Sequence, residues 1–315
     1  MKKIIKQVDE KRGILQVTIA DERWYVKEET DQTTGLPFHR YVPSVTWIAG
    51  HYPKGIGFYK WLADKGWDES QAIKSAAGDK GSKVHEAISA IFRGEEVRID
   101  SEFLNRSSGK LEELTLEEVD CIKSFVDWFA ENKPVNVAWD LTVFSEKLGF
   151  AGTIDYICRI GDELWLVDFK TSAQVWSEYE LQVSAYKEAL IEMQGRGDFS
   201  QIGDMRQAKL AILQVGYAKN KARYKWNEVA DQFPLFLAAR QIWAKECEGQ
   251  EPKKRDYPIV LSPAVTVEEA MMAAATPEPE PAIEYEQPTE YAEATPEPEP
   301  EPLPAKKRNK KYADE

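Results

Sequence analysis

Asp155, Asp168 and Lys170 are the residues of this chain whose types and spacing best suit chemistry. Side chains alternate between the two faces of a β-strand, so Asp168 and Lys170 point the same way and Phe169 points into the opposite layer. Asp155, on a preceding strand, can face the same pair. Two carboxylates and an ammonium group that converge in this way suit a divalent metal ion and a phosphate ester. The alternative is a solvated sheet edge, but Asp168 ends an apolar strand, where unpaired charge is costly.

A predicted β-hairpin positions these three side chains. Its first strand covers residues 150–159, its turn residues 161–163 and its second strand residues 164–170. A further strand over residues 135–145 precedes it and ends at Glu146. We therefore expect the hairpin to lie within a sheet.

Helices are predicted before the hairpin. A capping box at Thr115 and Glu118 opens a helix over residues 115–132. Residues 68–93 predict a longer helix, weakened at its centre by two glycines, with His85 in its second half. A lone histidine on a helix is more often structural than a ligand, so His85 gains a role only through its neighbours.

Three more elements are predicted after the hairpin: a helix over residues 177–193, a strand over 207–218 and a helix over 227–247. Gln182 and Tyr186 are four residues apart and share one face of the first helix. This order of elements predicts an α/β fold in which helices flank a central mixed sheet.

The N-terminal region has weaker signals. Alternating apolar residues within residues 1–30 predict a small hairpin. Ser44 or Thr46 is expected to cap a short helix that begins near Trp47. Residues 95–114 are polar and predict a loop or a short helix.

Residues 50–66 mix aromatic and basic side chains. Such a mixture can stack bases and neutralise phosphates of a single nucleic-acid strand. A helix that buries Phe58, Trp61 and Leu62 is the alternative, and both can hold at once. The aromatic and basic residues are Tyr52, Lys54, Phe58, Tyr59, Lys60, Trp61 and Lys65.

Charge and composition divide the chain into a domain over residues 1–262 and a tail over 263–315. The tail is rich in Pro and Glu, contains two near-copies of ATPEPEP and is predicted to be disordered. It ends in a basic cluster, KKRNKK, which is either a solubilising end or a contact for DNA or an acidic partner, and its acidic part suits a protein partner. The formal net charge is −13, much of it from the tail, so a DNA-binding body is not excluded.

Cys121, Cys158 and Cys247 show no C-x-x-C spacing, so neither a zinc site, an Fe–S cluster nor a disulfide framework is indicated. No apolar run is long enough for a membrane span, and no export signal follows the basic start of the chain. We therefore expect no membrane association and a cytoplasmic location.

Several motifs together resemble the PD-(D/E)XK nucleases, and within them the RecB-like branch. Gly152-Thr153-Ile154-Asp155, Asp168-Phe169-Lys170 and Gln182-Val183-Ser184-Ala185-Tyr186 are similar to its G-x-I-D, D-x-K and Q-x-x-x-Y series. Gly81 to His85 resembles its G-x-x-x-H element. Pro43 to Thr46, with a following W-L-x-x-K-G, resembles the mitochondrial genome maintenance exonuclease group and its phage relatives. The chain lacks the four-cysteine cluster of some RecB-like members.

The resemblance implies roles for individual residues. Asp155 and Asp168 would be the main ligands of one or two Mg²⁺ or Mn²⁺ ions, with His85 and the carbonyl of Phe169 as additional ligands. Glu146 would reach the site as a ligand of a second metal or as an outer partner. Lys170 would orient the attacking water or neutralise the scissile phosphate, and Gln182 and Tyr186 would position the site. DNA contacts are expected from Ser44, Thr46, Lys54, Tyr59, Lys60, Trp61 and Lys83.

The hypothesis is a hydrolase: a metal-dependent deoxyribonuclease, an exonuclease on single-stranded DNA ends in replication, repair or recombination, in a phage setting. Three alternatives stay open. The chain could be a catalytically silent relative that binds DNA ends, a protein-interaction module that works through its acidic tail, or an endonuclease or double-strand exonuclease on the same fold.

Overall fold

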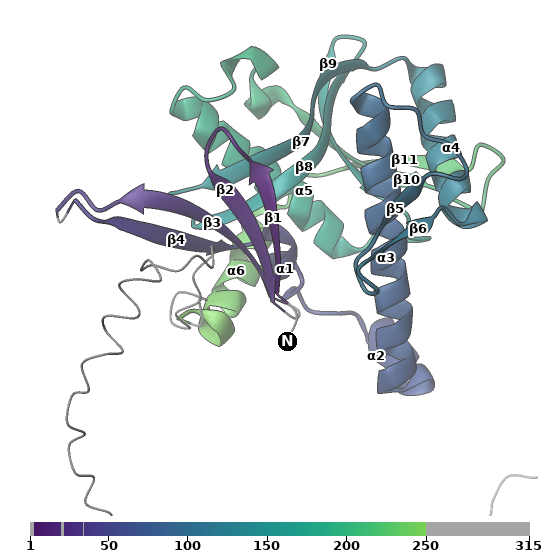
Figure 1. The fold of residues 1–315 in the computed structure, drawn as a ribbon, viewed down its shortest axis with the longest axis horizontal. Helices are drawn as coiled ribbons and strands as arrows, with labels where there is room; N and C mark the ends of the chain where they lie inside the picture. Colours follow the sequence, from purple (N-terminus) through teal and green to yellow (C-terminus); the bar gives the residue numbers. More distant parts are fainter. Residues whose placement is uncertain (1–2, 20–21, 34, 250–315) are drawn as a thin grey trace, which may run out of the picture. The chain divides into compact units, whose positions relative to one another are not determined.

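The computed structural model describes residues 3–19, 22–33 and 35–249, which belong to one compact unit (Figure 1). The predicted domain boundary at residue 262, the acidic tail and the basic cluster lie outside the described residues. The unit contains two larger sheets and a small hairpin.

The central sheet has five strands in the order β11-β10-β9-β8-β7. The first three in sequence form an antiparallel meander, β10 then joins β9 in parallel, and β11 closes the edge antiparallel to β10. This confirms the predicted mixed sheet and its central hairpin. The strands are β7 (Val135–Ser145), β8 (Phe150–Ile160), β9 (Glu163–Lys170), β10 (Lys209–Val215) and β11 (Tyr224–Val229).

Helices cover both faces of this sheet. On one face, α3 (Trp67–Phe92) and α4 (Leu116–Asn132) pack apolar side chains such as Ile88 and Phe125 onto Tyr156 and Phe169. On the other face, α5 (Ser177–Gly195) contacts the sheet, and α1 (Val45–Ala49) and α6 (Phe233–Cys247) pack beside it. Phe169 and Asp168 therefore serve opposite layers, as strand alternation requires.

The N-terminal region is larger than the hairpin predicted from its sequence. It is a four-stranded antiparallel sheet in the order β1-β2-β3-β4. Tyr25 of β3 joins it to the central sheet, because its hydroxyl lies 3.2 Å from Thr153 Oγ1 on β8. The strands are β1 (Lys3–Asp9), β2 (Ile14–Ile19), β3 (Glu22–Thr30) and β4 (Pro37–Pro43).

The helices that follow lead away from this sheet. Ser44 caps α1 by accepting a hydrogen bond of 3.1 Å from the Trp47 amide, which decides between the two predicted caps. Helix α2 (Ile56–Lys65) then leads into α3, which is one continuous helix of 26 residues in spite of its glycines. Figure 1 shows α2 beside the lower end of α3, and none of its residues is buried.

Two other predictions were wrong. Residues 95–114 contain the small hairpin of β5 (Glu102–Asn105) and β6 (Lys110–Glu113), whose short polar strands have no apolar alternation to announce them. The last helix begins at Phe233, because residues 224–229 pair with β10 as β11. Pro234 lies in its first turn, where the missing amide hydrogen costs nothing.

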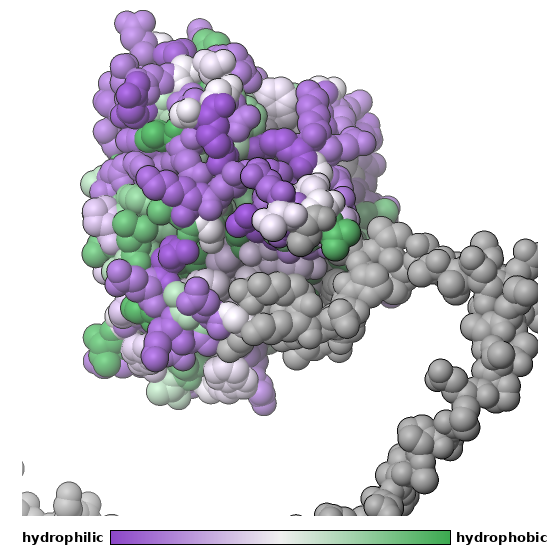
Figure 2. Space-filling model, turned by 90° about the vertical axis from the view of Figure 1, so that its left-hand side faces the viewer, coloured by the Kyte–Doolittle hydropathy of each residue, from purple (hydrophilic) through white to green (hydrophobic). Residues whose placement is uncertain are grey.

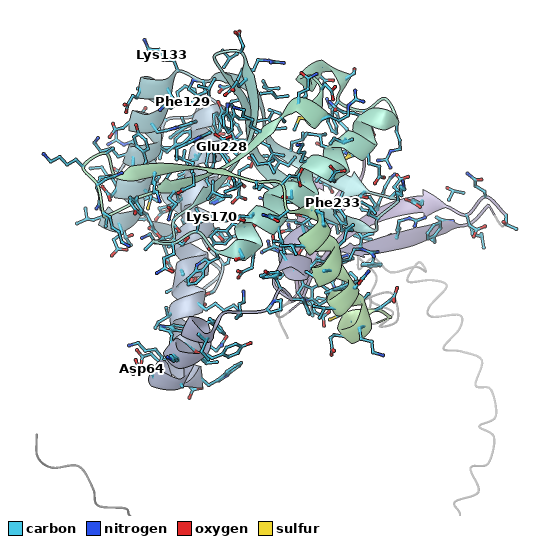
Figure 3. The ribbon with its side chains drawn as sticks, turned by 180° about the vertical axis from the view of Figure 1, so that it is seen from behind. Asp64, Phe129, Lys133, Lys170, Glu228 and Phe233 are labelled. Atoms are coloured by element: carbon cyan, nitrogen blue, oxygen red, sulfur yellow. The ribbon has the colours of Figure 1, made fainter. Side chains whose placement is uncertain are left out.

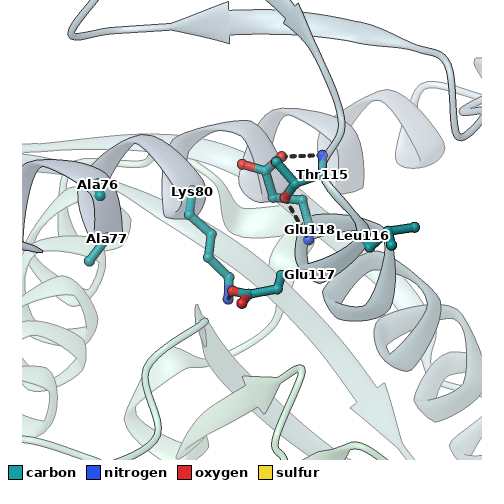
Figure 4. A pocket seen from close by; sticks show the side chains of 7 residues that line it. All are labelled: Ala76, Ala77, Lys80, Thr115, Leu116, Glu117 and Glu118. Atoms are coloured by element: carbon teal, nitrogen blue, oxygen red, sulfur yellow. Dashed lines mark hydrogen bonds and ion pairs between the residues drawn. The ribbon is translucent and has the colours of Figure 1, made fainter.

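The capping box of α4 is confirmed. The Glu118 amide donates to Thr115 Oγ1 and the Thr115 amide donates to Glu118 Oε2 (Figure 4).

Two short 3-10 helices, η1 (Ser200–Ile202) and η2 (Met205–Gln207), precede β10. Among the residues that the structure describes, no helix is both long and apolar enough to cross a bilayer. On the face in Figure 2, apolar side chains form separate spots among hydrophilic ones.

Candidate active site

Asp168 and Lys170 form a buried ion pair at the end of β9. The Asp168 side chain is 1% exposed and the Lys170 side chain 16%, and the ammonium group meets Oδ2 of the aspartate (Figure 3 labels Lys170). Gln182 of α5 donates a hydrogen bond of 3.1 Å to Oδ1. Among the described residues, the buried Oδ2 meets no hydrogen-bond donor other than the Lys170 ammonium.

Asp155 and His85 form the other half of the site. Asp155 Oδ2 accepts a hydrogen bond of 2.8 Å from the Phe169 amide, and its Oδ1 lies 3.2 Å from His85 Nδ1. The second ring nitrogen of His85 lies 2.9 Å from the Phe169 carbonyl oxygen. Both partners of the ring are acceptors, so the contacts favour a doubly protonated imidazolium that spans the cluster.

The electrostatics follow from this crowding. Burial raises the pKa of Asp168, Lys170 lowers it and Asp155 raises it, with a result of about 6. Burial opposes the charge of Asp155 too, but His85 and Lys170 lower its pKa below the ordinary value. Burial works against the charged form of Lys170, yet Asp168 and Asp155 raise its pKa, so the ammonium form is held.

Helix α5 supports the cluster from behind. The Gln182 side-chain amide donates both to Asp168 and, at 2.9 Å, to the Tyr186 hydroxyl. The Tyr186 ring lies so close to Gly152 that an added Cβ would be 2.3 Å from its Cε1. A glycine at residue 152 thus lets α5 approach β8. Gly152, Gln182 and Tyr186, which are far apart or spaced along the sequence, therefore pack together in the structure.

A model of the PD-(D/E)XK nuclease superfamily matches residues 58–263, which is more than half of the chain and includes every residue of this cluster. The chain belongs to the PD-(D/E)XK nuclease superfamily. Membership indicates a metal-dependent nuclease with DNA as its substrate, and the D-x-K of the superfamily's name is present as Asp168-Phe169-Lys170. The search among curated proteins gave no match to the chain.

The residues present fit the divalent ion that this superfamily uses. Within residues 3–19, 22–33 and 35–249, no three His, Cys, Asp or Glu side chains are already arranged to hold a metal ion. Mg²⁺, however, is commonly held by one or two carboxylates, with water and substrate phosphate as its other ligands. Asp155 and Asp168 supply two such carboxylates, and the Phe169 carbonyl oxygen lies 2.9 Å from His85 Nε2.

Glu146 does not belong with this cluster of the nuclease. It lies in the turn between β7 and β8, past the Ser145–Phe150 pair that ends their ladder, whereas Asp155 lies near the middle of that ladder. Its carboxylate is held by Lys27 at 3.1 Å and by Arg196 at 3.4 Å. The closeness of Glu146 to the hairpin in sequence predicted that it is a metal ligand. In the structure, the part of β8 from residue 150 to residue 155 separates Glu146 from Asp155.

Lys83 was predicted to contact DNA, which requires an exposed side chain, but the structure buries it. Its side chain is 4% exposed and its Nζ lies 2.8 Å from Glu118 Oε2, itself buried between α3 and α4. Ser44 is buried as the cap of α1, and Lys54 pairs with Glu178 at the start of α5. Of the predicted DNA contacts, Thr46, Tyr59 and Lys60 are exposed and Trp61 is half-buried.

Asp140 is an acid near the site that we did not predict. It sits on β7 between Trp139 and Leu141, which pair with Tyr156 and Ile154, so it lies across from Asp155. Burial raises its pKa, a hydrogen bond from Ser89 lowers it and Asp155 raises it, for a net increase. Its φ of 47° is rare for a residue with a side chain. The sequence signal that could have identified Asp140 is an acidic residue within the otherwise apolar strand of residues 135–145.

Two surface hollows of the described residues lie away from the nuclease cluster. A hollow of about 670 Å³ lies between α3 and the start of α4, where Lys80 pairs with Glu117 (Figure 4). A second, of about 230 Å³, is lined by polar residues near Arg159 and Asp204. Neither hollow is lined by a carboxylate of the cluster. The side chains of the cluster, and not the shape of the surface, therefore identify the candidate site.

Proposed function

We propose that this protein is a metal-dependent DNA exonuclease that acts on single-stranded ends in DNA replication, repair or recombination, on the RecB-like branch near the mitochondrial genome maintenance exonucleases and their phage relatives. The observation that carries the proposal is the buried cluster in which His85 and Asp155 face Asp168 and Lys170 around the Phe169 peptide.

Asp155 and Asp168 are the proposed ligands of Mg²⁺ or Mn²⁺. When bound there, such an ion supplies Lewis acidity, which activates water and neutralises charge on the phosphate. His85 joins as a ligand only after it loses one proton and one of its present contacts, to Asp155 or to the Phe169 carbonyl. An imidazole nitrogen among oxygen donors makes Mn²⁺ acceptable beside Mg²⁺.

Lys170 acts as a cation in this proposal. Its pKa is raised by Asp168 and Asp155 in spite of burial, so the group keeps its proton at neutral pH and does not serve as a base. Its ammonium can instead donate a hydrogen bond to water or to a phosphate oxygen. The contact between its Nζ and the Tyr179 ring, 4.8 Å from the centroid, and the ion pair with Asp168 fix its position.

The preference for single strands rests on α2. Phe58, Tyr59 and Trp61 form a cluster with ring centroids 5.6 and 5.9 Å from Phe58, and Tyr59 is 53% exposed. Lys60 adds an exposed positive charge. Exposed rings beside lysines can stack unpaired bases, which a duplex does not offer.

A substrate panel tests this proposal. Purified full-length protein is incubated with Mg²⁺ or Mn²⁺ and with linear or circular, single- or double-stranded DNA and RNA. We expect shortening of linear single-stranded DNA and no cleavage of circles. Cleavage of circular DNA would make the protein an endonuclease, and no cleavage of any substrate would contradict the proposed activity.

A further inference from the structure

Trp176 is an exposed tryptophan in the segment that joins β9 to α5. It is 45% exposed, and within the described ranges its ring packs against no other aromatic ring. Trp24 and Trp128, in contrast, are buried and pack against other rings. A single exposed tryptophan is common on protein surfaces, so its position decides whether it has a role.

The backbone of Trp176 lies next to the residue that covers the proposed catalytic lysine. The Trp176 carbonyl accepts a hydrogen bond of 2.9 Å from the Tyr179 amide. The Tyr179 ring lies over Lys170, with the lysine Nζ 4.8 Å from the ring centroid, and Lys170 forms the ion pair with Asp168. Tyr179 therefore contacts both Trp176 and Lys170, which places Trp176 at the edge of the candidate active site.

The segment that carries Trp176 is held in place. The Ser172 carbonyl accepts a hydrogen bond of 2.7 Å from the side chain of Gln214, which is the residue of β10 that pairs with Lys170. The Ser172 hydroxyl donates to the Gln174 carbonyl at 2.8 Å. Residues 171–176 are thus fastened to the sheet at one end and to α5 at the other, so the indole is presented by fixed backbone.

The charges beside Trp176 permit a nucleic-acid strand to approach. Glu178, in the first turn of α5, would repel phosphates, but its carboxylate contacts the ammonium group of Lys54. Lys54 lies two residues before α2, where Tyr59 and Lys60 are exposed. This ion pair therefore joins the start of α5 to the segment that leads into α2, so a single strand held on α2 can continue to Trp176.

We propose that the ring of Trp176 stacks on the base of the nucleotide next to the scissile phosphate. The proposal rests on the proposed function and adds to it a residue that positions the strand at the cleavage site. An indole can stack on any base, since every base has a π-face. A base that is paired within a duplex is not free to stack in this way, which fits a preference for single strands.

Strands that lack one base test the stacking. Single-stranded DNA with an abasic nucleotide at each of the first positions from either end is cleaved in Mg²⁺ by wild type, Trp176→Ala and Trp176→Phe, and kcat/KM is measured. We expect wild type to lose about tenfold at one position of the missing base. Trp176→Ala should lose about tenfold on the intact strand and nothing more when that base is missing, whereas Trp176→Phe should resemble wild type.

Trp67→Ala is the matched control. Trp67 is 68% exposed, and it begins α3, the helix that carries His85 in its second half. At 1.5 Å per residue, the two lie about 27 Å apart along the helix axis. Trp67→Ala should therefore lose as much as wild type does when the base is missing.

Three results would overturn the stacking while metal-dependent cleavage by wild type still stands. They are wild-type cleavage of the intact strand by Trp176→Ala, a tenfold loss in Trp176→Ala when the base is missing, and loss of the base dependence in Trp67→Ala. Affinity for the same strands in EDTA, measured by fluorescence anisotropy, keeps the two proposals apart. A base dependence of binding that Trp176→Ala removes, without cleavage by wild type, would contradict the nuclease proposal alone, and no binding of DNA would contradict both.

Discussion

Lys83 and Glu118 form an ion pair between α3 and α4, and Lys170 and Asp168 form another at the end of β9. The first pair is fully satisfied: Lys83 Nζ also lies 3.3 Å from the Glu113 carbonyl, and Glu118 also accepts the Thr115 amide. The second pair has another carboxylate, Asp155, nearby, and among the described residues Asp168 Oδ2 has no donor other than the lysine. The comparison teaches that a buried pair of a lysine and a carboxylate stabilises the fold where other protein groups complete its contacts. Such a pair can bind a ligand where a second carboxylate lies beside it.

The largest expected effect is on catalysis by Lys170→Met. In the proposed function this ammonium donates to water or to a phosphate oxygen, so its removal should lower cleavage about a thousandfold. Cleavage of labelled DNA at saturating Mg²⁺ measures it, and thermal unfolding checks that the variant is folded. Wild-type cleavage by a folded Lys170→Met protein would show that both pairs are structural.

The opposite result is expected for Lys83→Met. This change leaves the Glu118 carboxylate buried without its partner, which costs about 3 kcal/mol of the free energy of unfolding. Urea unfolding measures the loss, and cleavage per folded molecule should equal that of wild type. A Lys83→Met protein that keeps its stability but loses cleavage would reverse the comparison.

Gly152→Ala tests how the catalytic pair is held from α5. The added methyl group would meet the Tyr186 ring, so we expect a loss of about 2 kcal/mol and slower cleavage through displacement of Gln182. Gly78→Ala is the matched control, since nothing lies within 4 Å of its added Cβ and alanine favours a helix by about 1 kcal/mol. Equal effects of the two changes would show that the close packing at Gly152 has no role.

The smallest expected effect is the pH dependence of metal binding. Asp168 must be ionised to bind a cation, and its pKa of about 6 means that protons compete below that value. Affinity for Mn²⁺ should therefore fall by up to about tenfold per pH unit below pH 6. Calorimetric titration at pH 7.5 and 5 measures it, and Glu118→Gln should leave this dependence unchanged. Equal affinity at both values would place the ion elsewhere.

The sequence allowed the catalytic hairpin and α5 to be predicted because their periodicity is local. Asp168 and Lys170 share a face by alternation, and Gln182 and Tyr186 by helical spacing. Lys83 could not be predicted in the same way, because its burial depends on Glu118, which follows 35 positions later, after the β5–β6 hairpin. The strands β5 and β6 are short and polar, and β5 lies against α3, so their own residues carry little signal.

Metal-dependent cleavage of single-stranded DNA by Asp168→Asn, beside Glu146→Gln, tests the central claim most directly. Asp168 belongs to the cluster, whereas Glu146 pairs with Lys27 and Arg196 away from it. We predict that Asp168→Asn loses cleavage by about a thousandfold in Mg²⁺ and Mn²⁺ while it stays folded, and that Glu146→Gln cleaves as wild type does. Wild-type cleavage by Asp168→Asn, or an equal loss in Glu146→Gln, would contradict the assignment of the site.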